Sequence, residues 1–223
     1  MSKKSKIPVY FMPGMAANHL IFDGIKLPED TFEVYFLEWL IPEFKESLEH
    51  YAERLTENIR HENPVLIGVS FGGIVVQEMA KFIKLRKLII ISSVKHESEL
   101  PRRIKFARVT RVYKLIPTKL VKNIELLAKF AIGETVVNRM DLYQKYLSVR
   151  DPRYLSWAIH QIINWKQTQS NLELIHIQGD KDKVFPVINI QNFIAVKGGT
   201  HIMIVNRFKW FNEFLPLLIT EES

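Results

Sequence analysis

The chain has 223 residues, of which 47% are hydrophobic, and this length and composition fit one folded α/β domain and exclude a disordered chain. It has no cysteine, which excludes disulfides, thiolate catalysis and cysteine-based zinc sites. The formal net charge is +7, but no stretch reaches the roughly 18–20 apolar residues of a membrane span and none resembles a signal peptide, so we expect a cytoplasmic protein.

Short apolar runs alternate with segments of helical spacing along the chain. Within 44–61, the apolar side chains Leu48, Tyr51, Leu55 and Ile59 recur every three or four residues, which predicts a helix. The segment 87–92 is apolar almost throughout, as in a buried parallel strand. The expected strands are 7–12, 31–37, 65–69, 87–92, 172–178 and 192–197, and the expected helices are 44–61, 74–84, 151–165 and 202–218. This alternation predicts an α/β fold with a mostly parallel, six-stranded sheet flanked by helices.

Residues 95–150 interrupt this alternation. They have apolar side chains at helical spacing, and they contain 13 Lys and Arg against 5 Asp and Glu, so the positive charge of the protein is concentrated there. We expect residues 1–94 and 151–223 to form the core of one domain. Residues 95–150 are then expected to form a helical lid inserted over one end of the sheet.

The sequence Gly-Val-Ser-Phe-Gly at 68–72 lies between a predicted strand and a predicted helix. A sharp turn of this kind exposes the Ser70 hydroxyl above the carboxyl end of the strand, and small neighbours are required where backbone segments approach closely. The pattern also occurs by chance in ordinary strand-to-helix turns, but its position favours Ser70 as a nucleophile.

A serine nucleophile needs a base, and His201 is the best placed of the seven histidines. It follows a predicted strand and two glycines, which places it at the same edge of the sheet as Ser70. The others are less suitable: His50 and His61 lie at a helix distant from that edge, and His160 and His176 lie inside elements. His96 and His19 could approach the site, but no feature of the sequence positions them.

The carboxylate that orients the histidine is expected at the end of another strand. Asp180 and Asp182 both follow the strand predicted at 172–178, and their spacing does not distinguish them. Aspartate is also common in turns, so either residue could have only a local role.

Backbone N–H groups are the expected stabilisers of a developing oxyanion. The N–H of Phe71, directly after the nucleophile, is one candidate. The N–H of Met15, in the Pro-Gly loop after the first strand, is the other, although this loop alone could be a simple turn.

With these residues together, the chain resembles a small α/β-hydrolase over nearly its whole length. The matching motifs are PGMAAN for the oxyanion loop, GVSFGG for the nucleophile, GDKDKVFP for the acid and GGTH for the histidine, in the family's order. The resemblance implies that Asp182, the later aspartate, is the acid, with Asp180 in reserve, and that a lid enters where residues 95–150 lie. Two features depart from the family: its first two antiparallel strands are missing, and Pro-Gly replaces the common His-Gly.

These features predict a serine hydrolase of the carboxylesterase or thioesterase type, with Ser70, His201 and Asp182 as catalytic triad and no cofactor or metal. The family that the chain resembles also contains cofactor-free lyases and non-catalytic members. It contains dehalogenases too, but these have Asp at the position of Ser70. The alternatives are therefore a lyase of the same fold and a non-catalytic protein that binds a lipid or a protein partner.

The expected partner is a small-molecule acyl substrate. The basic lid is most simply a solvated surface, but it could also attract an acyl-CoA or rest weakly on an anionic membrane. We found no nucleic-acid-binding module, Walker loop, dinucleotide fingerprint or zinc-protease motif, so nucleic acid is not an expected partner. The sequence does not indicate the oligomeric state.

Overall fold

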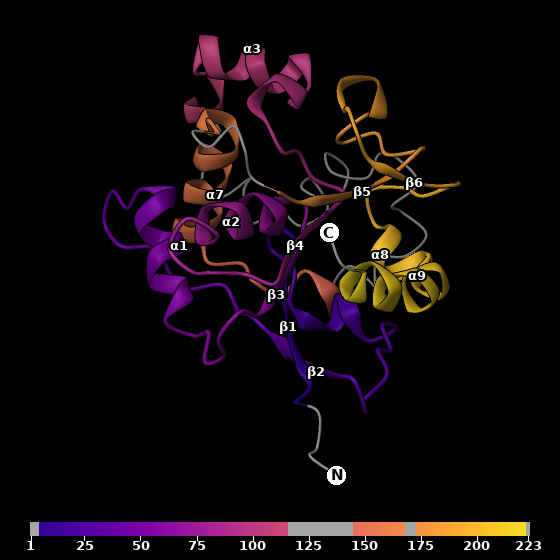
Figure 1. Cartoon of the computed structure of the whole chain (residues 1–223). Helices are drawn as coiled ribbons and strands as arrows, with labels where there is room; N and C mark the ends of the chain where they lie inside the picture. The colour runs from indigo at the N-terminus through magenta and orange to yellow at the C-terminus, as the bar shows by residue number, and fades with distance from the viewer. Residues whose placement is uncertain (1–4, 116–144, 168–172, 222–223) are drawn as a thin grey trace.

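The structure is a computed structural model and describes residues 5–115, 145–167 and 173–221. Its centre is one sheet with the order β2-β1-β3-β4-β5-β6, in which every neighbouring pair is parallel (Figure 1). The strands are β1 (Ile7–Met12), β2 (Phe32–Phe36), β3 (Val65–Val69), β4 (Lys87–Ile91), β5 (Ile175–Gly179) and β6 (Ile194–Val196). The six-stranded α/β sheet predicted from the sequence is confirmed, with each strand within a few residues of its expected position.

Alternate residues of the strands contribute to two hydrophobic cores, one on each face of the sheet. In β1, Tyr10 and Met12 face one core, and Val9 and Phe11 face the other. All five residues of β3 are buried, because helices cover both faces of this central strand.

Helices α1 (Leu48–Thr56), α2 (Phe71–Met79) and α7 (Pro152–Asn164) pack on one face of the sheet. Helices α8 (Met203–Asn206) and α9 (Phe208–Thr220), with the 3₁₀ turn η1 (His19–Phe22), cover the other face (Figure 1). A further 3₁₀ turn, η5 (Val187–Asn189), lies between β5 and β6. Among the described residues, no helix is both long enough and apolar enough to cross a bilayer.

Three helices differ from their predicted limits. Helix α2 begins at Phe71 rather than at 74. Its first turn contains Gly72 and Gly73, and the prediction started later because glycine disfavours helices. The helix expected at 44–61 begins only at Leu48, where the Ser47 side chain accepts a hydrogen bond from the His50 N–H and caps it. The last helix is divided into two at Arg207, whose backbone leaves the helical region and whose guanidinium donates to the Gly198 carbonyl.

Two parts of the expected lid are described: residues 95–115, with η2 (Glu97–Glu99), α3 (Arg102–Thr110) and η3 (Val112–Leu115), and residues 145–150. Among the larger apolar side chains of α3, Ile104 packs against the hydrophobic core, but two others face outward. Phe106 and Val109 are 65% and 82% exposed, whereas Arg108 donates to the Ile163 and Trp165 carbonyls at the end of α7. Residues 116–144 lie outside the described residues, so the limits and function of the lid remain predictions.

Candidate active site

Four loops of the candidate site leave the carboxyl ends of β1, β3, β5 and β6. The chain runs from β1 to β2 on one side and then returns to place β3 on the other side of β1, which makes the gap between β1 and β3 a topological switch point (Figure 1). Ligand sites in parallel sheets form at this point, because the loops of the two strands diverge there. The loop 13–18 and Ser70 are the segments that follow these two strands.

Ser70 forms a strained corner between β3 and α2. Its φ of 54° and ψ of −119° are rarely adopted by residues other than glycine, and such a conformation costs on the order of 1–3 kcal/mol. Three hydrogen bonds hold the corner: Ser70 N–H donates to the Ile91 carbonyl at 2.9 Å, and Gly73 N–H and the Ser93 hydroxyl donate to the Ser70 carbonyl at 2.9 and 2.7 Å. Ser70 is half-buried rather than enclosed in the core.

The glycines beside Ser70 are required by close backbone contacts. A Cβ at Gly68 would lie 2.3 Å from the Gly72 carbonyl oxygen, and a Cβ at Gly72 would lie 2.3 Å from the Pro13 carbonyl oxygen. Both distances are well inside van der Waals contact, so a side chain at either position would push the strand, the helix and the oxyanion loop apart.

His201 connects the serine to the acid. Its Nε2 lies 2.9 Å from Ser70 Oγ, and its Nδ1 lies 2.9 Å from Asp182 Oδ2. Because an ionised carboxylate can only accept, the hydrogen is on Nδ1, and Nε2 is then free to accept the hydrogen of the Ser70 hydroxyl. The edge of the Phe185 ring packs against the imidazole, with centroids 5.6 Å apart.

Asp182 is buried and fully hydrogen-bonded. Its Oδ1 accepts from the backbone N–H groups of Val184 and Phe185 at 2.7 and 3.0 Å, and its Oδ2 accepts from Gln178 Nε2 at 2.9 Å as well as from His201. Burial raises the pKa of the Asp182 carboxyl, but His201 and the two backbone donors outweigh burial and hold the pKa below its usual value. The carboxylate is therefore ionised and fixed in direction.

The structure places the two candidate aspartates in different environments. Asp180 is exposed, and its carboxylate accepts from the Gly198 N–H at 2.7 Å across the loop between β5 and β6. Only Asp182 reaches His201. This geometry favours Asp182 over Asp180 as the partner of the histidine.

The loop 13–18, which is predicted to supply an oxyanion donor, lies directly beside Ser70. A Cβ at Gly14 would lie 3.4 Å from the Ser70 Cβ. Phe71 is the first residue of α2, so its N–H has no acceptor within the helix. Within the described ranges, the Met15 N–H donates to no protein acceptor. Neither predicted donor group therefore has a backbone acceptor among the described residues.

The other histidines have partners elsewhere. His61 hydrogen-bonds to the hydroxyls of Tyr10 and Tyr35, and His160 lies 3.0 Å from the Tyr113 hydroxyl. His96 caps η2, and exposed His19 packs against the Phe36 ring. None of them contacts Ser70 in the part of the chain that the structure describes.

His176 lies inside a strand, as predicted, and it is part of the core. It lies in β5, is 2% exposed, and hydrogen-bonds through Nε2 to the Ser93 carbonyl at 3.1 Å. Burial, with a smaller effect of Lys95, lowers its pKa to about 4, so the imidazole is neutral near pH 7. Its position beside the acid loop does not bring it to the serine.

Sequence reasoning missed several side chains that hold the site in place. Gln178 donates to both Asp182 and the Phe185 carbonyl, and Ser93 donates to the Ser70 carbonyl. A glutamine next to Ile177 in a buried strand was a usable signal for Gln178. Trp39, which donates to the Gly14 carbonyl, gave no such signal.

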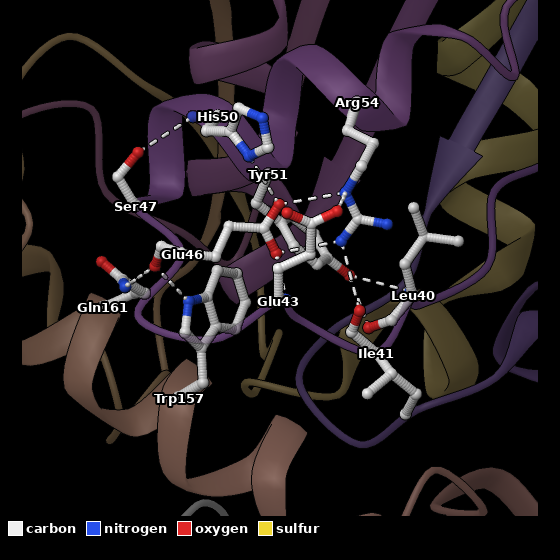
Figure 2. Close-up of polar contacts among 10 residues, drawn as sticks. All are labelled: Leu40, Ile41, Glu43, Glu46, Ser47, His50, Tyr51, Arg54, Trp157 and Gln161. Carbon is white, nitrogen blue, oxygen red and sulfur yellow. Dashed lines mark hydrogen bonds and ion pairs between the residues drawn. The ribbon is translucent and has the colours of Figure 1, made fainter.

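Glu43, Glu46 and His50 form the one grouping of metal-ligand side chains found in the described ranges, with ligand atoms within 4.8 Å of one another. Figure 2 shows that Arg54 already occupies it: Nε and Nη2 donate to the two oxygens of Glu46 at 3.0 and 2.9 Å. Because the guanidinium neutralises the buried carboxylate, we interpret the cluster as a structural ion pair rather than as a metal centre.

A cavity of about 620 Å³ opens near the amino ends of β4 and β5, at the opposite end of the sheet from Ser70. Its lining residues are Ala80, Ile83, Lys84, Leu85, Arg86, Lys87, Leu88, Glu173, Leu174 and Ile175. None of the residues proposed for catalysis contributes to it, so we do not assign the chemistry to this cavity.

No family model and no curated protein sequence matches the chain. Solved structures do match. An esterase from Exiguobacterium antarcticum superposes with a TM-score of 0.71 at 16% identity, over 97% of this chain and 93% of the esterase. A hydrolase from Oleispira antarctica gives 0.70 at 14% identity, over 98% and 93%.

A bromoperoxidase from Bacillus anthracis gives a TM-score of 0.65 at 17% identity, over 97% of this chain and 93% of the bromoperoxidase. At such identities the likeness concerns the fold and not the activity. The parallel sheet, the strained serine corner after β3 and these superpositions together show that the chain has the α/β-hydrolase fold.

Proposed function

We propose that the protein is a serine hydrolase that cleaves a carboxylic ester or thioester through an acyl-enzyme intermediate. The observation that carries the proposal is the continuous hydrogen-bonded chain from Ser70 Oγ through His201 to buried Asp182, with both links at 2.9 Å. A serine hydroxyl is a weak nucleophile, and an imidazole in this position with its tautomer fixed is the arrangement that activates it.

In the proposed reaction, Ser70 Oγ attacks the acyl carbon while its proton moves to His201 Nε2. The carbonyl oxygen becomes an oxyanion, and the N–H groups of Met15 and Phe71 are the proposed donors to it. His201 then gives the proton to the leaving alcohol or thiol as the bond between it and the acyl carbon breaks.

Deacylation repeats these steps with water. His201 removes a proton from a water molecule, the hydroxide attacks the acyl carbon, and the carboxylic acid leaves as the proton returns to Ser70. Throughout, the negative charge of Asp182 stabilises the imidazolium form of His201 and prevents ring rotation. These steps use only groups present in this chain and water.

Two of the structural neighbours are esterases, which is consistent with this proposal, because they share the overall fold of this chain. A small-molecule acyl compound remains the proposed substrate. Contact of the basic segment 95–150 with an acyl-CoA or an anionic membrane also remains a prediction, since about half of that segment lies outside the described residues.

The test is labelling by a fluorophosphonate, which phosphonylates only an activated serine. We expect labelling of wild type at Ser70 and none of Ser70→Ala, with turnover of p-nitrophenyl esters or acyl-CoA thioesters from a panel of increasing chain length. Mass spectrometry during turnover should find the acyl group on Ser70. Absence of labelling of folded wild type favours the non-catalytic binding protein, and turnover without a trapped acyl group favours the lyase.

A further inference from the structure

Trp39 lies between β2 and α1 and reaches the oxyanion loop 25 residues earlier in the chain. Its indole Nε1–H donates to the Gly14 carbonyl at 3.1 Å, and the same oxygen accepts from the Ala17 N–H at 3.0 Å. Two donors in fixed positions determine the direction of this carbonyl. The contact therefore controls the peptide unit that joins Gly14 to Met15.

The Gly14 carbonyl and the Met15 N–H belong to the same peptide plane. Since the bond is trans, the N–H points opposite to the carbonyl, so fixing the oxygen also fixes the direction of the hydrogen. A hydrogen bond accepted by a carbonyl also polarises its peptide unit and strengthens the N–H as a donor. The next residue, Ala16, has a strained φ of 65°, so the loop needs such restraint.

The same indole packs on the residue that carries the second donor. Trp39 stacks on Phe71, with ring centroids 5.2 Å apart and planes only 7° from parallel. It also contacts the Tyr154 ring at 5.1 Å, and the Tyr154 hydroxyl accepts from the Ala16 N–H at 3.4 Å. One side chain thus touches both halves of the proposed oxyanion hole.

The chain immediately after Trp39 is clamped by α1, as Figure 2 shows. The Tyr51 hydroxyl bonds to both the N–H and the carbonyl of Leu40 at 2.9 and 3.1 Å, and Arg54 donates to the Ile41 carbonyl at 3.2 Å. Arg54 is itself held by Glu46. The ion-pair cluster that carries no metal proposal therefore anchors the segment that presents Trp39.

We propose that Trp39 is a positioning residue of the oxyanion hole: it aims the Met15 N–H through the Gly14 carbonyl and holds Phe71 by stacking. This inference rests on the proposed serine hydrolase function. The alternative is that Trp39 only fills space among aromatic side chains. In that case its loss changes stability, but it has no separate effect on the transition state.

Two substitutions of the same kind separate these possibilities. Trp39→Phe keeps an aromatic ring against Phe71 but removes the donor to Gly14. Trp157→Phe is the matched control. The Trp157 and Phe71 ring centroids are 6.0 Å apart, and the Trp157 indole N–H donates to the Glu46 carbonyl at 2.8 Å. The control loses an indole hydrogen bond that does not involve the oxyanion loop.

We expect Trp39→Phe to lower kcat on the best p-nitrophenyl ester about 10- to 100-fold with little change in KM, as for a misaligned catalytic group. Affinity for a trifluoromethyl ketone, which forms a tetrahedral oxyanion on Ser70, should fall by a similar factor. Trp157→Phe should keep both values close to wild type. If Trp39→Phe does not fold, the benzothienyl analogue of tryptophan at position 39, which has sulfur in place of the N–H, repeats the test with the same ring shape.

Equal kcat and ketone affinity in Trp39→Phe and Trp157→Phe overturn the positioning proposal. A rise in KM with unchanged kcat does so too, since it indicates that Trp39 contacts substrate without serving the oxyanion hole. Absence of fluorophosphonate labelling in wild type is a different result, because it overturns the serine hydrolase proposal itself. Wild-type labelling with an unaffected Trp39 variant overturns only the role of Trp39.

Discussion

The described part of the chain contains two histidine–carboxylate pairs with the same Nδ1-to-oxygen distance, and one of them lies beside Ser70. Glu46 and Asp182 each place an oxygen 2.9 Å from a histidine Nδ1, on His50 and His201 respectively. Both carboxylate side chains are fully buried, and both have pKa values below the usual range. The pair itself therefore does not distinguish a catalytic site from a structural one.

The difference lies in what else the carboxylate contacts. Burial raises the pKa of Glu46, but Arg54, the Glu43 N–H and His50 outweigh it, and Arg54 neutralises its charge. Asp182 has neutral donors besides His201, and no Lys or Arg forms an ion pair with it within the described ranges. Its negative charge is thus available to stabilise an imidazolium on His201.

The largest expected effect comes from making each carboxylate an amide. Asp182→Asn should lower kcat about 10,000-fold, because the amide donates to His201 Nδ1 and shifts the imidazole hydrogen to Nε2, where it cannot accept the Ser70 proton. Glu46→Gln should leave kcat close to wild type. Initial rates on one p-nitrophenyl ester, corrected for folded protein, measure both, and a similar loss of kcat in the two variants would contradict the comparison.

The second prediction concerns the stability of the protein and Arg54, the cation that pairs with Glu46 but has no counterpart at Asp182. Arg54→Met leaves the buried Glu46 carboxylate without its counter-ion and should lower the free energy of unfolding by about 4 kcal/mol. Urea unfolding at pH 7 measures the loss. Adding Glu46→Gln removes the unpaired charge and should restore part of it, so a double variant no more stable than Arg54→Met would rule out this electrostatic cause.

A third buried group, His176, tests a histidine that has no carboxylate hydrogen-bonded to it. Its pKa is about 4 in the folded protein and about 6.5 when unfolded, so the unfolded chain binds the proton first as the pH falls. Wild type should lose about 3 kcal/mol of stability between pH 7 and pH 4 through this group, and His176→Gln should lose less. Urea unfolding at pH 7, 5.5 and 4 measures the two slopes, and equal slopes would contradict the assignment.

The lowered pKa values of Glu46 and Asp182 change the stability of the protein at lower pH than the His176 pKa does. A carboxyl group with a depressed folded pKa stabilises the protein above its unfolded pKa, which is about 4, and this stabilisation is lost as the pH falls through the folded value. The effect of His176 should therefore appear at milder acidity than that of the two carboxylates.

The strand pattern of the sequence alone predicts that Ser70, Asp182 and His201 lie at one edge of the sheet, because parallel strands bring their carboxyl ends together. The glycines around Ser70 were similarly informative, since close backbone approach leaves a local signature. The catalytic roles of these residues remain predictions. The choice of Asp182 came from the family resemblance, since the spacing alone fitted Asp180 equally well.

The supporting contacts could not be predicted in this way. Trp39 meets Gly14, and Arg54 meets Glu46, through side-chain directions that no strand or helix period encodes. The division of the last helix at Arg207 depends on a hydrogen bond to Gly198 in a preceding loop. In α3, Phe106 and Val109 face outward, and Arg103 and Arg108 donate to carbonyls of neighbouring segments.

The smallest expected effect is that of His50, the counterpart of His201. Its side chain is 53% exposed, against 11% for His201, and Glu46 keeps Arg54 and the Glu43 N–H when His50 is changed. His50→Gln should therefore lower the free energy of unfolding by less than about 1 kcal/mol and leave kcat unchanged, whereas His201→Gln should abolish turnover. Urea unfolding and ester hydrolysis of both variants measure this. A large loss of activity in His50→Gln would contradict the purely structural role of the His50–Glu46 pair.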